Sequence, residues 1–443
     1  MSHTRRVLFG ILSSALLFSL AAIAQVTAIK AGKLVDAETG NTLSNQVILV
    51  EGTKITAVGP NLNIPSDAKV IDLSHETVLP GMVDAHTHMC LGFRLYGSMP
   101  IPHGGSTSPT SIVDASRSLL EAVFLASVSD TTGYRAIQGV ANARSMLENG
   151  FTSIRDVGNN GNYADTDLRR AIEEGIVPGP TMVNAGRIIA PFGGQFPQLL
   201  SPEKPRIGIP EYFYADTQDE MKKAIRENIL YGATVIKIVV DDQPYIYSVD
   251  DIKFIVGESH SAGRKVAAHC WTDKGALVAA EGGVDSIEHG PYMSNETLQV
   301  AKRNKVVLVG TEYTQFVADA MRAPQWHQMY IERLKRANQV GITMAFGSDL
   351  DVEIPGHSRG ELAVSDVENY IEAGVPAKAV LQIMTLNGSR LLGLDKERGE
   401  IKPGLAADIV ATPLNPLDDL RTLEHVDFVM KDGKVFKSEQ PVQ

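Results

Sequence analysis

The sequence predicts an α/β protein: a (β/α)8 TIM barrel with a small β-sandwich domain built from both chain ends. Three observations predict this fold. Short apolar strands alternate with amphipathic helical segments through the middle of the 443-residue chain. Histidines or an aspartate end several of these strands. Short strands with Gly-containing turns occupy both chain ends. The expected organisation is a signal peptide at 1–24, the β-sandwich domain at 25–80 and 396–443, and the barrel at 81–395.

The composition narrows the class of protein. The chain is 44% hydrophobic and 21% charged, which is ordinary for a globular protein, and its length can hold a large barrel plus a smaller domain. Its 41 Lys and Arg residues against 52 Asp and Glu give a net charge of −11, without a basic run, so no nucleic-acid partner is expected. The two cysteines, Cys90 and Cys270, make no disulfide framework, and we expect both to be buried thiols.

The first residues differ in character from the rest. Two arginines precede an almost wholly apolar run at 7–23, and an A-x-A sequence ends at Ala24. This is the pattern of a secretory signal peptide, for which an uncleaved membrane anchor is the alternative. The mature protein, from Gln25, is therefore expected to be exported, either periplasmic or secreted, with no stable membrane anchor after cleavage.

The sequence predicts antiparallel strands at both chain ends. The first end contains TAIKAGKLVD, NQVILVEGTKITAVG and AKVIDLSHETVLPG, and the second contains ADIVATPL and VDFVMKDGKVFK. Gly-containing hairpins such as KDGK connect strands of this kind. We therefore expect the two ends to pair into one β-rich domain.

Eight apolar segments in the middle of the chain predict the barrel strands. They are GMVDAH, TSIRDV, TMVNAG, TVIKIVV, KVAAHC, VDSIEH, VVLVGT and TMAFGSD. Amphipathic segments such as TQDEMKKAIRENILYG and DDIKFIVGESHSAG lie between most of them and end in Gly, as helices often do. The longest excursion, from Met89 to about Gln138, begins with Gly, Pro and Ser and is expected to lie over the barrel mouth.

Histidines or an aspartate end four of these strands, which is where barrel enzymes carry their chemistry. His86 and His88 are two residues apart, so in a strand both imidazoles leave the same face, although an isolated HxH is more often solvated or packed. Strands five and six end in His269 and His289, and strand eight ends in Asp349. Nitrogen and carboxylate ligands of this kind suit zinc or a similar transition metal.

Lys237 lies inside the otherwise apolar segment TVIKIVV. Burial lowers the pKa of a lysine, and a neutral amine near a metal can react with CO2 to form a carbamate that bridges two cations. The alternative is a snorkelling lysine or an internal salt bridge. The convergence of the other candidate ligands favours the metal site.

The segments GMVDAHTH, TVIKIVV, VAAHC, SIEHG and FGSD together resemble the amidohydrolase superfamily. The closer resemblance is to its imidazolonepropionase-like and prolidase-like branch, which includes exported dipeptidases and ochratoxin-degrading amidases. TSIRDVGN, TLNGSRLLGL and GEIKPGLAADIVATPLNPL extend the resemblance over nearly the whole mature chain. It implies two zinc ions bridged by hydroxide and by N6-carboxylated Lys237, with the remaining ligands divided as His86, His88 and Asp349 on one ion and His269 and His289 on the other.

The resemblance implies a metal-dependent hydrolase that acts on carbon–nitrogen bonds. The expected reaction is cleavage of the amide bond to a C-terminal amino acid, in dipeptides or N-acyl amino acids including ochratoxin A, by attack of hydroxide. Asp349 would accept a proton from the water and pass it to the leaving nitrogen, with a helix N-cap as its structural alternative. Lys237 counts against deamination, because the mononuclear deaminases of the superfamily generally lack this lysine.

Two other functions remain open at this point. One is hydrolysis of a cyclic amide or an imidazolone. The other, from a different class, is a non-catalytic barrel scaffold, although every expected ligand position is filled. Relatives commonly form oligomers, so a homo-oligomer is compatible with the resemblance.

Tyr231 and Arg155 are two of the candidate substrate contacts. Tyr231, just before the fourth strand and also a candidate catalytic residue, offers a phenol that can donate to a carbonyl or carboxylate, or can pack as a last-turn aromatic. Arg155, near the end of the second strand, can pair with Asp156 or attract a substrate carboxylate.

Three further candidates lie in loops after strands. His357 and Arg359, in PGHSRGEL after strand eight, can form a cationic wall of the pocket or remain solvated. Phe196 follows Gln195 in the loop after strand three, where the related family often has a histidine. The phenylalanine suggests an apolar subsite.

Overall fold

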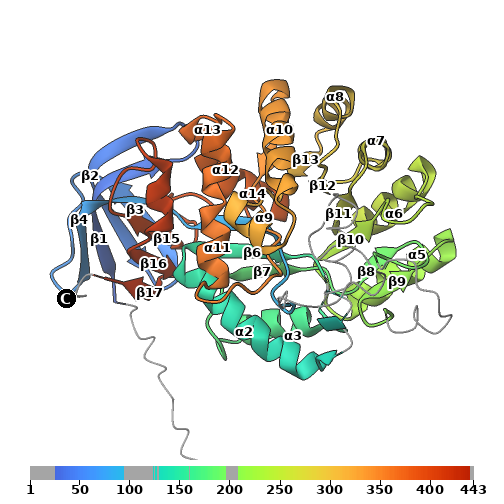
Figure 1. Ribbon diagram of the computed structural model, residues 1–443. Helices are drawn as coiled ribbons and strands as arrows, with labels where there is room; N and C mark the ends of the chain where they lie inside the picture. The colour runs from blue at the N-terminus through green and yellow to red at the C-terminus, as the bar shows by residue number, and fades with distance from the viewer. Residues whose placement is uncertain are drawn as a thin grey trace, which may run out of the picture.

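The computed structural model describes residues 25–93, 123, 125–126, 129–158, 160–195 and 208–439. The expected signal peptide at 1–24, most of the loop expected over the barrel mouth, and Phe196 lie outside the described residues. The described residues form a barrel with a β-rich domain at one side, where the blue N-terminal and red C-terminal strands lie together (Figure 1).

The β-rich domain joins the two chain ends in one seven-stranded sheet of order β17-β16-β15-β4-β1-β2-β3. Its strands are β1 (Thr27–Asp36), β2 (Asn41–Glu51), β3 (Lys54–Gly59), β4 (Lys69–Pro80), β15 (Ile409–Thr412), β16 (Phe428–Lys431) and β17 (Lys434–Ser438). Strands β4 and β15 pair antiparallel, with Val78 opposite Ala411. Alternate side chains of β2, such as Ile48 and Val50, are buried, as a strand with one covered face requires. The prediction that both ends build one β-rich domain is confirmed.

The barrel contains the eight predicted strands. They are β5 (Met82–Thr87), β6 (Phe151–Asp156), β7 (Thr181–Asn184) continued by β8 (Ile188–Ala190), β10 (Val235–Val239), β11 (Lys265–Cys270), β12 (Ser286–His289), β13 (Val307–Val309) and β14 (Met344–Ala345). Neighbouring strands pair in parallel, and a short β9 (Tyr212–Tyr214) adds to β8. The barrel closes between the first and last strands, where Ala85 N–H donates to the Phe346 carbonyl at 2.8 Å and Asp349 N–H donates to the His86 carbonyl at 2.9 Å.

Helices surround the barrel (Figure 1). They are α2 (Thr132–Glu148), α3 (Ala164–Glu173), α5 (Gln218–Leu230), α6 (Val249–Ser261), α7 (Asp273–Gly282), α8 (Asn295–Arg303), α9 (Gln315–Ala320), α10 (Gln325–Val340), α11 (Arg359–Ser365), α12 (Val367–Glu372), α13 (Ala377–Gln382), η1 (Ile383–Asn387), α14 (Gly388–Leu392) and η2 (Leu420–Glu424). Helix α5 begins at a capping box formed by Thr217 and Glu220 and ends before Gly232, whose φ of +96° is readily adopted by glycine. Within the described ranges, no helix combines the length and the apolar character needed to cross a membrane.

Cys90 and Cys270 are both buried and free, as predicted. Burial raises the pKa of each thiol well above its ordinary value, so both remain protonated at neutral pH.

A buried glutamate makes the β-rich domain sensitive to pH. Glu76 on β4 has one carboxylate oxygen that is buried and without a hydrogen-bond partner. Burial, together with repulsion from Asp427 and Glu439, raises the pKa of Glu76 from 4.5 to about 7. Because the folded state binds this proton more tightly than the unfolded chain, the contribution of Glu76 to stability falls as the pH rises from about 4.5 through 7.

We predict that Glu76→Gln raises the melting temperature at pH 8, because the variant removes a buried charge and gives its neighbours an amide donor. At pH 4.5 the glutamate is already neutral in the folded state, so the difference should be much smaller. Thermal unfolding of both proteins at the two pH values measures this. Glu51→Gln, at an exposed position of β2, is the control. An equal shift at both pH values would contradict the assignment.

Candidate active site

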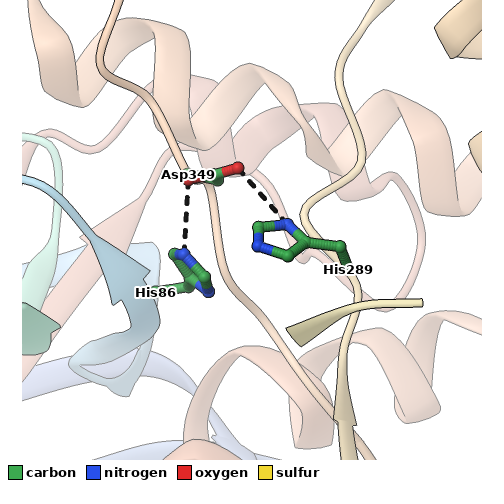
Figure 2. Close-up of side chains that lie close together, drawn as sticks. All are labelled: His86, His289 and Asp349. Carbon is green, nitrogen blue, oxygen red and sulfur yellow. Dashed lines mark ion pairs between the residues drawn. The ribbon is translucent and has the colours of Figure 1, made fainter. Parts of the chain in front are cut away.

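The carboxyl ends of the barrel strands bring three histidines, His86, His88 and His289, together around Asp349, with His269 beside His289. Nε2 of His86 lies 3.3 Å from Oδ1 of Asp349, and Nε2 of His88 lies 3.0 Å from the same oxygen. His289 approaches the other oxygen, with its Nδ1 3.4 Å from Oδ2 (Figure 2). The two imidazoles of the HxH sequence therefore leave β5 on one face and meet the aspartate that follows β14.

A left-handed backbone shapes this rim. His289, Thr311 and Asp349 have φ values of +67°, +56° and +52°. Each costs about 1–2 kcal/mol for a residue with a side chain, and such residues concentrate at functional sites. In a regular strand Glu288 and His289 would point to opposite faces. The left-handed conformation ends that alternation, so both reach His86.

Each of the four histidines has one ring nitrogen held by an oxygen of the surrounding protein. The pairs are His86 Nδ1 with Glu288 at 2.7 Å, His88 Nδ1 with the Gly158 carbonyl at 2.9 Å, His289 Nδ1 with the Thr311 hydroxyl at 2.9 Å, and His269 Nε2 with Asp242 at 3.0 Å. Metal-ligating histidines are oriented in this way, with one nitrogen held and the other presented to the ion.

The remaining nitrogens fit a metal site. Nε2 of His86 is buried and has no hydrogen-bond partner. One ligand atom from each of His86, His289 and Asp349 lies within 4.8 Å of the others, which is close enough to share an ion. The ring of His269 lies 4.5 Å from that of His289, between ring centres, which extends the cluster to a second position. Imidazole and carboxylate together suit zinc.

Lys237 lies inside the barrel on β10 and is 2% exposed. Burial lowers the pKa of its ammonium, Glu288 and Asp349 raise it, and the result is a pKa of about 8. Lys237 is therefore electrostatically coupled to the same carboxylate that the histidines surround.

Asp349 is held in its charged form. Burial alone would raise the pKa of Asp349, but His86 and His289 bring it well below its ordinary value. The Tyr313 hydroxyl also donates to Oδ2 of Asp349 at 2.9 Å. Tyr313 follows β13 with no pattern in the sequence to mark it, and it was not among the predicted site residues.

Arg155 has a different role from the two expected. Its guanidinium donates to Glu288 at 2.7 Å, to the Ser286 hydroxyl at 3.0 Å and to the Ala85 carbonyl at 2.5 Å. The side chain is fully buried, so Arg155 neither pairs with Asp156 nor faces a substrate. It holds Glu288, which in turn holds His86.

Glu288 is a second residue that the sequence prediction missed. Burial opposes its ionisation, yet Arg155 and His86 lower its pKa to about 2. The signal was present as two polar residues, Ser286 and Glu288, at alternate positions of a buried strand.

Three other predicted substrate contacts do not join the cluster. Tyr231 is 53% exposed at the end of α5, on the outer layer, where its ring lies 4.9 Å from that of Tyr163. His357 is exposed beside Phe316, with ring centres 5.1 Å apart. Arg359 is buried and donates to the Leu91 carbonyl at 2.9 Å, so it does not share a cationic wall with His357.

Comparison with known proteins agrees with this geometry. The Amidohydrolase family profile matches residues 77–436. An ochratoxinase from Aspergillus niger is 26% identical, over 94% of this chain and 87% of the relative, and an imidazolonepropionase from Alkaliphilus metalliredigens is 23% identical, over 88% and 89%. The crystal structure of a Xaa-Pro dipeptidase with methionine bound in the active site superposes with a TM-score of 0.76 at 26% identity, covering 94% of this chain and all of that chain, 100%.

The predicted (β/α)8 barrel with a β-rich domain is confirmed, as is the resemblance to the amidohydrolase superfamily. The matched region covers most of the chain and contains every barrel strand. The chain is therefore a member of the Amidohydrolase family, a hydrolase that acts on carbon–nitrogen bonds.

Proposed function

We propose that this protein is a binuclear zinc amidohydrolase that cleaves the amide bond to a C-terminal amino acid in dipeptides or N-acyl amino acids. The observation that carries the proposal is the set of four histidines, each with one nitrogen held by the protein, of which three surround Asp349 and the fourth, His269, lies beside His289. Two relatives support the substrate class: an ochratoxinase, and a Xaa-Pro dipeptidase whose active site holds methionine.

We divide the candidate ligands into two groups, as the resemblance to the superfamily implies. His86, His88 and Asp349 would hold one zinc ion, and His269 and His289 the other. Lys237 would lie between them as a carbamate, formed when its neutral amine adds to CO2 and loses one proton. When bound, such ions lower the pKa of a water molecule and polarise a substrate carbonyl.

The chain's own residues would carry the proton. Asp349, held ionised by its histidine neighbours, accepts a proton from the attacking water. A carbon–oxygen bond forms at the amide carbon, the carbon–nitrogen bond breaks, and Asp349 returns the proton to the leaving nitrogen. Tyr313 fixes one oxygen of Asp349, and the Arg155–Glu288 pair fixes the ring of His86.

Aromatic side chains at the barrel rim favour an apolar substrate. Phe192, Tyr245, Tyr292 and Phe316 follow β8, β10, β12 and β13 and are 50%, 48%, 41% and 51% exposed. Loops after barrel strands surround the site in this fold. We therefore propose an apolar amino acid on the leaving side; the related dipeptidase structure has methionine, an apolar amino acid, bound in its active site.

A cyclic-amide or imidazolone hydrolase is the second candidate, favoured by the similarity to an imidazolonepropionase. We also propose, from the sequence of residues 1–24, that the mature protein is exported.

We predict that Lys237→Ala lowers kcat/KM by more than about 100-fold, because even residues that only orient metal ligands change metal affinity or activity by 10–100-fold. The variant should also lose at least one of its two zinc equivalents. Zinc content by mass spectrometry and hydrolysis rates measure both effects.

Lys265→Ala is the matched control for this experiment, since Lys265 begins the neighbouring strand β11 and donates to the Arg390 carbonyl, away from the histidines. An alanine variant of Lys237 with two tightly bound zinc ions and full turnover would show that the site assignment is wrong.

We predict that zinc-loaded protein hydrolyses dipeptides and N-acyl amino acids ending in Met, Leu or Phe at least about 10-fold faster, in kcat/KM, than those ending in Asp or Lys, because fit in an apolar pocket changes rates by this order. Quantifying the released amine across a panel with varied C-terminal residues measures the preference. Turnover confined to lactams or imidazolones would keep the metal chemistry and overturn the substrate class.

A further inference from the structure

A hydrogen-bonded chain of side chains leads to His269 from outside the histidine cluster. The Tyr212 hydroxyl donates to Oε1 of Gln195 at 3.1 Å, and the Gln195 amide donates to Asp242 at 2.8 Å. The Asp242 carboxylate then accepts from Nε2 of His269 at 3.0 Å. Asp242 follows β10, and its side chain is 14% exposed.

The neighbouring Asp241 serves another purpose. Its two oxygens accept from the backbone N–H groups of Trp271 and Thr272, at 2.8 and 2.7 Å, and from the Thr272 hydroxyl at 2.6 Å. Asp241 therefore fixes the turn between β11 and α7. Of these two aspartates, Asp242 is the one hydrogen-bonded to the histidine.

We propose that Asp242, oriented by Gln195, is a positioning residue that holds His269 for the second metal ion. The inference rests on the proposed zinc centre. Because Nε2 of His269 donates to Asp242, its lone pair lies on Nδ1, whereas His86 and His88 are held through Nδ1 and direct Nε2 at Asp349. The His269 ring must therefore have the opposite orientation to those of His86 and His88, so that Nδ1 rather than Nε2 is left for a metal ion. The hydrogen bond to Asp242 holds the ring in this orientation.

Gln195 gives this arrangement its second support. Its amide lies 3.4 Å from Nδ1 of His269 while donating to Asp242. Both oxygens of Asp242 are thereby engaged, because Gln195 donates to Oδ2 and Nε2 of His269 lies 3.0 Å from each of the two. A carboxylate with both oxygens engaged is suited to orienting a ring rather than to binding a substrate amine.

The test is a zinc titration of the mature protein with Asp242→Ala, Asp242→Asn and Gln195→Ala, after zinc removal and in competition with a chromophoric chelator. We expect wild type to bind two zinc ions. In Asp242→Ala one ion should bind 10–100-fold more weakly while the other keeps its affinity, with smaller effects in the other two variants.

Asp285→Asn is the matched control, because Asp285 accepts from Nε2 of His260 at 2.8 Å in a partly exposed pair outside the site. It should leave both zinc affinities unchanged. If Asp242→Ala does not fold, Gln195→Ala tests the proposal in its place. A Gln195→Ala variant that binds both zinc ions with wild-type affinity would overturn the proposal.

Other results separate the alternatives. Unchanged zinc binding in Asp242→Ala, with KM raised for dipeptides but not for N-acyl amino acids, would make Asp242 a substrate-amine contact and overturn the proposal. A third zinc ion in wild type, lost in Asp242→Ala, would make it a direct ligand and overturn it as well. If wild type binds no zinc, the proposed function fails first.

Discussion

The closure of the barrel between β5 and β14 is the constraint on which the site depends. Asp349 donates its backbone N–H to the His86 carbonyl, so the last strand is tied to the first at the residues that carry the chemistry. The same contact brings the carboxylate of Asp349 to within 3.3 Å of both His86 and His88. A change in the stagger of these two strands would move the aspartate away from the histidine pair.

Behind this contact the barrel buries charged side chains. Arg155 and Glu288 form a buried pair, and Glu288 also holds His86, so a cation, an anion and an imidazole are aligned in one row. Buried pairs of this kind contribute little net stability, but losing one partner leaves an uncompensated charge at a cost of about 3–5 kcal/mol. We therefore infer that the pair orients His86: it keeps the ring in one position, with Nε2 directed at Asp349.

The sequence predicted the strands of the barrel and the convergence of the histidines with Asp349, but not the residues that hold these side chains in place. Strand ends in a parallel barrel meet at one rim, so His86, His269, His289 and Asp349 could be expected to converge from their places alone. Glu288 was missed although Ser286 and Glu288 alternate in a buried strand, because strand alternation places only one of Glu288 and His289 on the inner face. The left-handed backbone at His289 lets both side chains reach His86.

The stagger between strands also decides where Tyr231 lies. Thr234, just before β10, donates its N–H to the carbonyl of Asn184 at the end of β7, and Ile238 of β10 pairs with Ile189 of β8, so the fourth strand starts level with the junction of β7 and β8. Tyr231, at the end of the preceding helix α5, packs on Tyr163. Sequence position gives the order of elements along the chain but not the stagger between strands.

The central claim is that two metal ions lie in this cluster. Anomalous diffraction at the zinc edge, from crystals of the zinc-loaded mature protein, tests it most directly. The account predicts two peaks, one beside His86, His88 and Asp349 and one beside His269 and His289, with a carbamate on Lys237 between them. A single peak beside an unmodified Lys237, or zinc bound elsewhere, would contradict it.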